Sequence, residues 1–287
     1  MISLLETLAG ASPTTAIELR PPFIELNAVD GINAWIDTYH AVYGVTSKNR
    51  YVFLTDSAIG QREEHSIRHL VTNLGNDAPR ERVVPFLTAK HSLDYCLGYA
   101  DRASENDFRT LVVVGGDNTV GSASCVAHGW QLRELIRKRQ PHLELVGWVN
   151  PIKDSQQQIE YLTQAVASTD FYLTQVVSHH HLAEIENFLI TSERNALNIP
   201  GMFGVFYYRS GNQRTLNLLS KFLPVPRTQL IKEFSSGLTA EQICARSIHR
   251  LRRIGIKHFY ISNLPVDQAP SLLNTILTLA TNDLEDP

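Results

Sequence analysis

The chain has 287 residues, of which 43 % are hydrophobic and 19 % are charged, with 26 Lys and Arg against 29 Asp and Glu. This is the composition of an ordinary globular protein that can bury a large core, and its formal net charge of −3 gives no long-range attraction for nucleic acid or an anionic membrane surface. We therefore expect neither nucleic acid nor a membrane as a partner.

The N-terminal stretch is apolar but lacks Lys and Arg and contains Glu6, which favours a short helix at 1–12 covering one end of the fold over a signal peptide. No run of about 18 apolar residues occurs, so no transmembrane helix is expected. The three cysteines, Cys96, Cys125 and Cys244, form no CxxC pair and indicate neither a disulfide framework nor a zinc site. A reducing, cytoplasmic location is therefore expected.

A short apolar or β-branched run followed by a segment of helical periodicity recurs along the chain. We predict eight strands, at 15–19, 51–54, 82–87, 110–114, 144–149, 171–174, 199–205 and 258–261. All but the last begin 27 to 36 residues after the preceding one, the length of one strand, one helix and two turns. The longer last interval holds helical patterns at 213–223 and 226–234, then a helix with a capping box at Thr239 and a terminating Gly255.

Strands that read as near-continuous apolar runs are typical of a parallel sheet covered by helices. Eight strand-helix units predict an α/β fold, a closed (β/α)8 TIM barrel, as a single domain over residues 1–287. The alternative is an open doubly wound sheet, which usually has fewer strands. In a barrel, functional residues follow the strands at the C-terminal face.

Glu18 lies within the first predicted strand rather than after it. If its side chain points into the barrel, burial raises its pKa towards the range of a general acid. If it points outwards, it meets a basic side chain on a helix. The periodicity of this strand is compatible with both orientations.

Polar residues follow the second and fourth predicted strands. Thr55 opens a Thr-Asp-Ser cluster that either serves a ligand or satisfies the backbone of a turn. Gly115 and Gly116 let a ligand or another backbone approach closely, and Asp117 then stands at the mouth of the fourth strand. The spacing matches no phosphate-binding motif, and a simple turn with a helix-capping Asp explains it equally well.

The sixth predicted strand leads into Gln175, whose neutral amide suits the donor and acceptor edge of a heterocycle. Three histidines follow at 179–181, but sequence neighbours seldom converge on one ion and no metal-binding spacing supports them, so no metal site is predicted. Three aromatic residues at 206–208 offer a wall for a flat ring or ordinary core packing. We expect at least one of them to face solvent or ligand.

Together, the acid on the first strand, the Asp after the fourth, the amide after the sixth and the aromatic residue after the seventh resemble the methylenetetrahydrofolate reductase family. The resemblance covers most of the chain and rests on the order of short pieces: Ile17–Pro22, Thr55, Pro85–Thr88, Gly116–Asp117, Thr174–Gln175, Ile199–Gly201 and Gly255–Asn263. It implies reduction of 5,10-methylenetetrahydrofolate to 5-methyltetrahydrofolate by NADH or NADPH, a step of one-carbon metabolism that feeds methionine biosynthesis.

In that chemistry the methylene bridge opens to an N5 iminium cation before hydride arrives, and opening requires a proton at N10. The resemblance implies that Glu18 is the general acid and that Asp117 stabilises the cation and binds the pterin edge. It further implies that Gln175 holds the pterin amide and that Tyr208, where the family usually has Phe, stacks near the aminobenzoate. Thr55 would position the pterin or the dinucleotide.

The resemblance implies a reduced nicotinamide, and it places cofactor contacts at Thr55, Thr88, Gly115 and Gly116. Flavin-containing members have a His where this chain has Phe86, an Arg where it has Gly115, and a segment rich in Tyr, Glu and His where it has 148–153. Because a pyrophosphate without basic partners is hard to hold, direct hydride transfer from NADH or NADPH is favoured over a relay through bound FAD.

Two other functions stay open. A folate-dependent barrel methyltransferase would pass on a methyl group without redox chemistry and would need a site for the acceptor or a corrinoid. A non-catalytic folate-binding protein would keep the pterin pocket and lack hydride transfer. The sequence also leaves open whether the chain forms a homo-oligomer.

Overall fold

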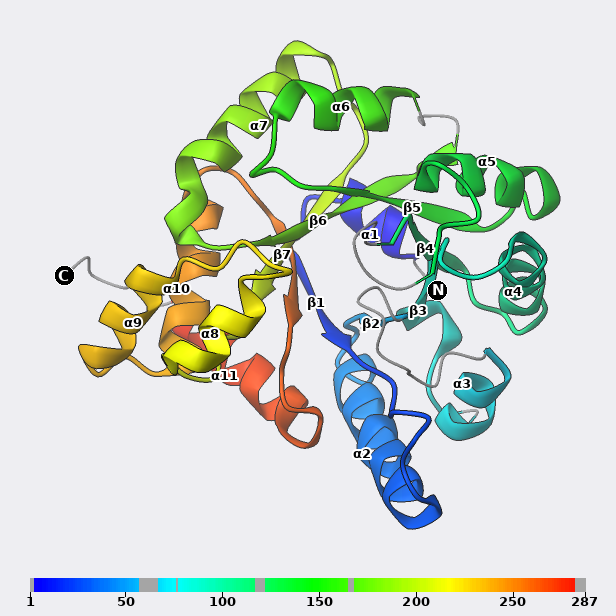
Figure 1. The fold of residues 1–287 in the computed structure, drawn as a ribbon, viewed down its shortest axis with the longest axis horizontal. Helices are drawn as coiled ribbons and strands as arrows, with labels where there is room; N and C mark the ends of the chain where they lie inside the picture. The colour runs from blue at the N-terminus through cyan, green and yellow to red at the C-terminus, as the bar shows by residue number, and fades with distance from the viewer. Residues whose placement is uncertain (1–2, 57–66, 76, 117–121, 165–167, 282–287) are drawn as a thin grey trace.

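The structure, a computed structural model, describes residues 3–56, 67–75, 77–116, 122–164 and 168–281. Eight parallel strands pair in sequence order, and the eighth pairs with the first to close a barrel (Figure 1). The strands are β1 (Thr14–Leu19), β2 (Val52–Leu54), β3 (Val83–Thr88), β4 (Thr110–Val114), β5 (Glu144–Val149), β6 (Phe171–Val177), β7 (Gly201–Phe206) and β8 (His258–Ser262). The predicted (β/α)8 TIM barrel is confirmed, and the open sheet is excluded.

Helices surround the barrel, with two more than the alternating pattern requires between β7 and β8. They are α1 (Leu4–Ala9), α2 (Ala28–Thr46), α3 (Ile67–Leu74), α4 (Leu93–Glu105), α5 (Gly129–Arg139), α6 (Ser155–Gln164), α7 (Leu182–Arg194), α8 (Gln213–Leu219), α9 (Arg227–Ser235), α10 (Ala240–Arg253) and α11 (Ala269–Thr281). None of the helices in the described ranges is long and apolar enough to cross a membrane.

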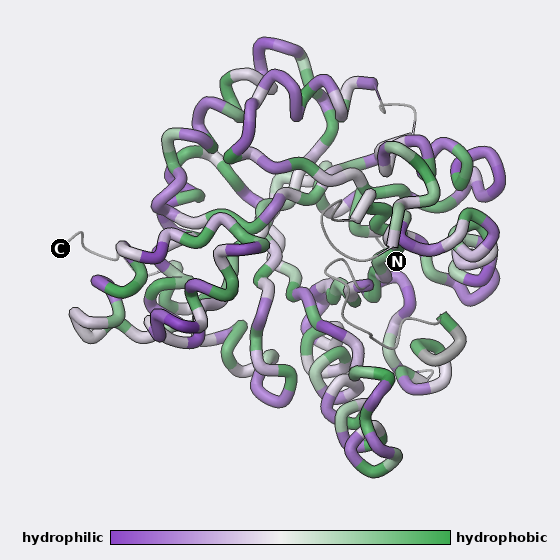
Figure 2. Tube along the Cα trace, viewed as in Figure 1, coloured by the Kyte–Doolittle hydropathy of each residue, from purple (hydrophilic) through white to green (hydrophobic). Residues whose placement is uncertain are grey.

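The predicted ends of α10 follow from local chemistry. Thr239 Oγ1 accepts a hydrogen bond from the backbone of Gln242, and the Gln242 side chain accepts one from the backbone of Thr239. Gly255, just after the helix, has a φ of +96°, which an L side chain rarely adopts. Hydrophobic and hydrophilic residues alternate along the surrounding helices (Figure 2), because one face of each packs on the barrel.

Alternate side chains of the strands fill the barrel interior and form one buried cluster. Leu4 and Leu8 of α1 belong to this cluster, so the helix expected within residues 1–12 packs against one end of the barrel. The interior strand residues are Ala16, Phe53, Val84, Phe86, Val112, Val146, Phe171, Leu173, Met202 and Tyr260. A packed interior is no channel, so the strand ends are where a ligand can bind.

Candidate active site

The carboxyl group of Glu18 lies on the inner wall of the barrel at the C-terminal end of β1. Ala16 packs in the interior, and because strand side chains alternate between faces, Glu18 points to the same side. The pairing of β1 with β8 sets Ile17 opposite Ile261 and therefore brings Glu18 beside Ser262. The Ser262 hydroxyl donates a hydrogen bond of 3.0 Å to Glu18 Oε1. Of the two orientations that the sequence allowed, the structure shows the inward one.

The environment of Glu18 favours the protonated carboxyl. Burial raises its pKa above the usual value, while the hydrogen bond from Ser262 and the charge of Arg20 oppose the rise. The side chain still keeps partial exposure. A carboxyl of this kind holds a proton closer to neutral pH than an exposed glutamate does, and it can pass that proton to a bound molecule.

Four aromatic side chains, the four-aromatic cluster, line the barrel interior near Glu18: Phe53, Phe86, Trp148 and Tyr260. Their centroids are 6.0 Å apart from Phe53 to Phe86, 6.3 Å from Phe86 to Trp148, 6.5 Å from Trp148 to Tyr260 and 5.8 Å from Tyr260 to Phe53, so the four close a circle. Burial, and to a smaller extent the Glu18 charge, raise the pKa of Tyr260. The four-aromatic cluster is part of the apolar environment that disfavours the ionised form of Glu18.

The Tyr260 ring is fixed by β6 and β7. Its buried hydroxyl donates a hydrogen bond to the backbone oxygen of Thr174. A Cβ atom added at Gly204 would lie 2.4 Å from the Tyr260 hydroxyl oxygen, so β7 can pack against Tyr260 only because residue 204 is a glycine. The Thr174 hydroxyl accepts a hydrogen bond of 3.0 Å from the backbone nitrogen of Gly204, which ties the three residues together.

Gln175 lies at an irregularity of β6, where the pairing with β7 shifts register between Leu173 and Val176. Its side-chain oxygen accepts a hydrogen bond of 2.9 Å from the backbone nitrogen of Val176. Its amide nitrogen donates to no other residue in the described ranges, and the side chain is partly exposed. Gln175 is thus held through its oxygen, with two donor hydrogens to offer a ligand.

The two glycines after β4 are packed against other parts of the chain. Gly116 has a φ of +80°, and an added Cβ would lie 2.7 Å from Cγ of Lys90 and 2.8 Å from the Thr88 hydroxyl. At Gly129, the first residue of α5, an added Cβ would lie 2.9 Å from the backbone nitrogen of Gly115. These glycines therefore let the chain approach itself closely. Their role in cofactor binding stays a prediction, and Asp117 lies outside the described residues.

Thr55 and Thr88 occupy the ends of β2 and β3. The Thr55 hydroxyl donates to the backbone oxygen of Leu19 over 3.4 Å, and the side chain is partly exposed. Thr88 is only 1 % exposed, and its backbone nitrogen donates to Asp56 Oδ2 over 2.8 Å. The same Asp56 oxygen lies 2.8 Å from His91 Nε2, so Asp56 ties the end of β2 to the segment after β3. Thr88 offers a ligand far less surface than Thr55 does.

The aromatic residues at 206–208 are all buried, so of the two expected orientations, towards solvent or towards a ligand, the solvent-facing one is wrong. Phe206 and Tyr208 pack together, with ring centroids 4.8 Å apart, against Leu216 of α8 and Leu230 of α9. Tyr207 points to the other side and donates a hydrogen bond to Glu241. The extra helices between β7 and β8 cover this segment. Stacking of Tyr208 on a ligand stays a prediction, and the side chain has 5 % of its surface available for it.

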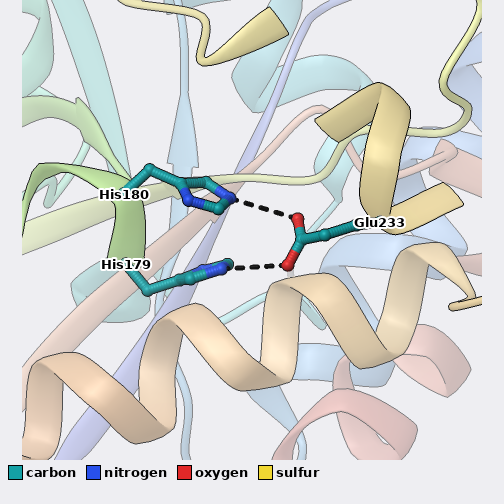
Figure 3. A group of neighbouring side chains, drawn as sticks. All are labelled: His179, His180 and Glu233. Carbon is teal, nitrogen blue, oxygen red and sulfur yellow. Dashed lines mark hydrogen bonds and ion pairs between the residues drawn. The ribbon is translucent and has the colours of Figure 1, made fainter. Parts of the chain in front are cut away.

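Two of the three neighbouring histidines converge on one carboxylate. Glu233 of α9 lies 3.0 Å from His179 Nε2 and 3.2 Å from His180 Nε2 (Figure 3). It also accepts a hydrogen bond of 3.1 Å from Arg246. Although burial acts to raise it, the hydrogen bonds from the two histidines hold the pKa of Glu233 at about 2. His179 Nδ1 is 2.9 Å from the Ser247 hydroxyl on α10.

These side-chain atoms of His179, His180 and Glu233 lie within 4.8 Å of one another, which is compact enough for a metal ion. The Arg246 guanidinium, however, already neutralises the carboxylate, and a cation at hydrogen-bond distance repels a metal ion. We interpret the group as a network of polar contacts that joins the end of β6 to the helices α9 and α10. The absence of a metal site stays a prediction.

The barrel thus brings the predicted residues Glu18, Thr55, Gln175 and Tyr208 to one end, because the carboxyl ends of its strands meet there. Sequence reasoning missed Ser262 and the four-aromatic cluster. Strand alternation is the signal that could have found them, since Tyr260 and Ser262 are two residues apart on β8. The arrangement offers a proton donor and a neutral amide beside the four-aromatic cluster, of which Trp148 is the partly exposed member.

No protein-family model matches the chain, and no curated protein matches its sequence. Among solved structures, the chain is similar to one described as an uncharacterized protein from Clostridium thermocellum that binds two copies of 5-methyl-5,6,7,8-tetrahydrofolic acid. The similarity covers 96 % of this chain and 98 % of that one, with a TM-score of 0.69 and 15 % sequence identity. At this identity the similarity shows a shared barrel fold.

Proposed function

We propose that this protein reduces 5,10-methylenetetrahydrofolate to 5-methyltetrahydrofolate with a hydride taken directly from NADH or NADPH. The observation that carries the proposal is the inward Glu18 carboxyl, which accepts a hydrogen bond from Ser262 beside the four-aromatic cluster. Burial raises the pKa of this carboxyl. The resemblance of the strand-end residues to the reductase family supports it. So does the similar solved barrel, whose described ligand is the product of this reaction.

In the proposed reaction the Glu18 carboxyl gives its proton to N10 of the folate. The bond between the methylene carbon and N10 breaks, and the N5 electron pair forms an iminium cation with that carbon. The dihydronicotinamide transfers hydride to the methylene carbon, which becomes the N5 methyl group, and is itself oxidised. Glu18 regains its proton from water at the partly exposed end of the barrel.

Binding of the pterin is assigned to groups that suit a flat, polar-edged ring. The partly exposed Trp148 ring provides a stacking or edge contact, and the Gln175 amide nitrogen provides two hydrogen-bond donors. Thr55 has a partly exposed hydroxyl at the same end of the barrel and would position the pterin or the nicotinamide. The proposal also includes stabilisation of the iminium cation by Asp117, a role that rests on the resemblance to the reductase family.

Direct transfer is proposed over an FAD relay because the described residues around Gly115 and Gly116 are engaged with one another. The Lys90 side chain lies over Gly116, and its ammonium group donates to the backbone oxygen of Ser122 over 2.8 Å. Thr88 is enclosed beneath the same glycine. Tight retention of a flavin diphosphate needs basic partners, whereas NADH or NADPH binds and leaves in each turnover. Lys90, the basic side chain beside Gly116, already donates to Ser122.

The test is to mix the purified protein with 5,10-methylenetetrahydrofolate and NADH or NADPH, with and without added FAD. The proposal predicts oxidation of the nicotinamide that needs the folate and not the flavin. A yellow protein whose activity follows its FAD content would overturn direct transfer. Folate binding without nicotinamide oxidation under any condition would exclude the reductase and leave the methyltransferase and the non-catalytic folate-binding protein.

A further inference from the structure

The outer face of α2 and the segment before it expose a cluster of large apolar side chains. Among the described residues eleven large hydrophobic side chains are exposed, and seven of them lie between residues 23 and 43. They are Phe23, Ile24, Leu26, Val29, Ile32, Ile36 and Tyr43. Val29 and Ile32 are the most exposed, at 68 % and 62 %. Exposed apolar residues scattered singly are normal, whereas a contiguous patch marks an interaction site.

This face of α2 is not used by the barrel. The buried residues of the helix, from Thr38 to Thr46, all lie in its C-terminal half. Its N-terminal half extends away from the strands (Figure 1). Val29, Ile32, Ile36 and Tyr43 repeat at helical spacing, so they form a stripe along one side, where a surface helix usually has polar residues.

The stripe borders a hollow between α2 and α3. Ile32, Trp35, Ile36 and Tyr39 of α2 and Asn73 of α3 line it, and its volume is about 200 Å³. A hollow of this size accepts one or two side chains from another molecule. The surface therefore has both a raised apolar ridge and a recess beside it, the two elements of a complementary interface.

We propose that this surface is the interface of a homodimer in which two copies of α2 pack antiparallel about a twofold axis near Ile36. A twofold interface must be complementary to itself, and the stripe meets this requirement in length and charge. Antiparallel packing sets Val29 of one copy near Tyr43 of the other. It also opposes the two helix dipoles, which is the favourable arrangement.

The charges beside the stripe favour the antiparallel arrangement. The N-terminal half of α2 carries Asp30 and Asp37 and no basic residue, while the exposed His40 and Lys48 lie in and just after the C-terminal half. In an antiparallel pair with its axis near Ile36, Asp30 of one helix comes near His40 of the other, while Asp37 lies beside the axis. In a parallel pair like charges would meet, which costs affinity.

The area is also adequate for self-association. The seven exposed side chains present on the order of 600 Å² of surface, against about 800 Å² per partner in a standard stable interface. Flanking polar residues of α2 and α3 supply the remaining area. Phe23, Ile24 and Leu26, which follow β1 in the chain, belong to this surface, so the proposed interface lies close in sequence to Glu18.

The test is the mass of the full-length protein in solution, measured by light scattering after size-exclusion chromatography from about 1 to about 100 μM. The proposal predicts a dimer that the double substitution Ile32→Glu with Ile36→Glu converts to a monomer with unchanged far-UV circular dichroism. The matched controls are Ile190→Glu on α7 and Leu218→Glu on α8, which are similarly exposed and should leave the dimer intact.

A second pair of variants keeps the test informative if the double substitution unfolds. Asp30→Lys should weaken the dimer, and adding His40→Glu should restore part of the loss. A wild-type monomer at the highest concentration would overturn the proposal. So would a dimer that survives the α2 substitutions, or one that the α7 or α8 control breaks.

Discussion

Ser262 Oγ donates a hydrogen bond of 3.0 Å to Glu18 Oε1, joining the last strand of the barrel to the first at the proposed site. A hydroxyl that donates to a carboxyl group stabilises the ionised form and so lowers its pKa, opposing the effect of burial. With Oε1 engaged as an acceptor, the proton of the neutral acid resides on Oε2. Oε2 is therefore the atom that would deliver the proton.

Ser262→Ala should shift the pH profile of turnover to higher pH. Without the hydroxyl the Glu18 pKa rises further, so the carboxyl keeps its proton at higher pH and the alkaline loss of rate moves upwards. The measurement is kcat against pH for nicotinamide oxidation. Ser262→Thr, which keeps a hydroxyl, should retain the wild-type profile, and identical profiles for the Ala variant and wild type would remove Ser262 from this role.

Glu18→Gln should stabilise the folded protein at neutral pH. A carboxyl whose pKa is raised by folding costs stability above its unfolded pKa, because ionisation is easier in the unfolded chain. The gain in melting temperature should be zero below about pH 4, grow as the pH rises through the folded pKa, and reach a few degrees. Thermal unfolding from acidic to alkaline pH measures it, without any activity assay. A variant less stable than wild type at neutral pH would show that the ionised carboxylate is well accommodated.

Gly204→Ala should destabilise the protein by about 1–3 kcal/mol, because the added methyl group overlaps the Tyr260 ring and pushes it from the Thr174 backbone oxygen. Urea unfolding measures the change. Gly98→Ala on α4 is the matched control, since its added Cβ meets only the flexible end of Arg102 and alanine favours a helix. In a Tyr260→Leu background the cost of Gly204→Ala should fall; an unchanged cost would mean that the clash lies elsewhere.

Glu233→Gln should destabilise the protein at neutral pH and not at strongly acidic pH. The folded pKa of about 2 lies below the unfolded value, so the ionised Glu233 stabilises the fold above about pH 4 and loses this contribution as the pH falls towards 2. Chemical unfolding at several pH values measures the difference between variant and wild type. Glu186→Gln, an exposed change on α7, is the control. A pH-independent difference would contradict the account, and stabilisation by added Zn²⁺ would show that the cluster binds metal.

The fold followed from the sequence because its signals are local and repeated. Apolar runs such as 110–114 and 144–149 became β4 and β5 with the predicted bounds, and the capping box at Thr239 began α10. Counting eight units was enough to favour closure over an open sheet. These features depend on near neighbours in the chain, which a single sequence displays.

The site was harder to predict because its contacts join residues far apart in the chain. Ser262 lies 244 positions from Glu18, and their contact depends on the closure of the barrel. The burial of Tyr208 depends on α8 and α9 folding over the end of β7. The convergence of His179 and His180 on Glu233 depends on the tight turn after β6 that points both rings the same way. Sequence spacing alone does not report any of these contacts.

The role of Glu18 in folate reduction is tested by the turnover of wild-type protein and Glu18→Gln with 5,10-methylenetetrahydrofolate and NADH or NADPH, together with folate affinity by calorimetry. We expect folate-dependent oxidation of the nicotinamide by the wild type. We expect a loss of turnover of about 10²-fold or more in the variant while folate still binds, since the amide keeps the shape of the side chain and removes the proton. Near-normal turnover by Glu18→Gln, or no turnover by the wild type, would contradict this role.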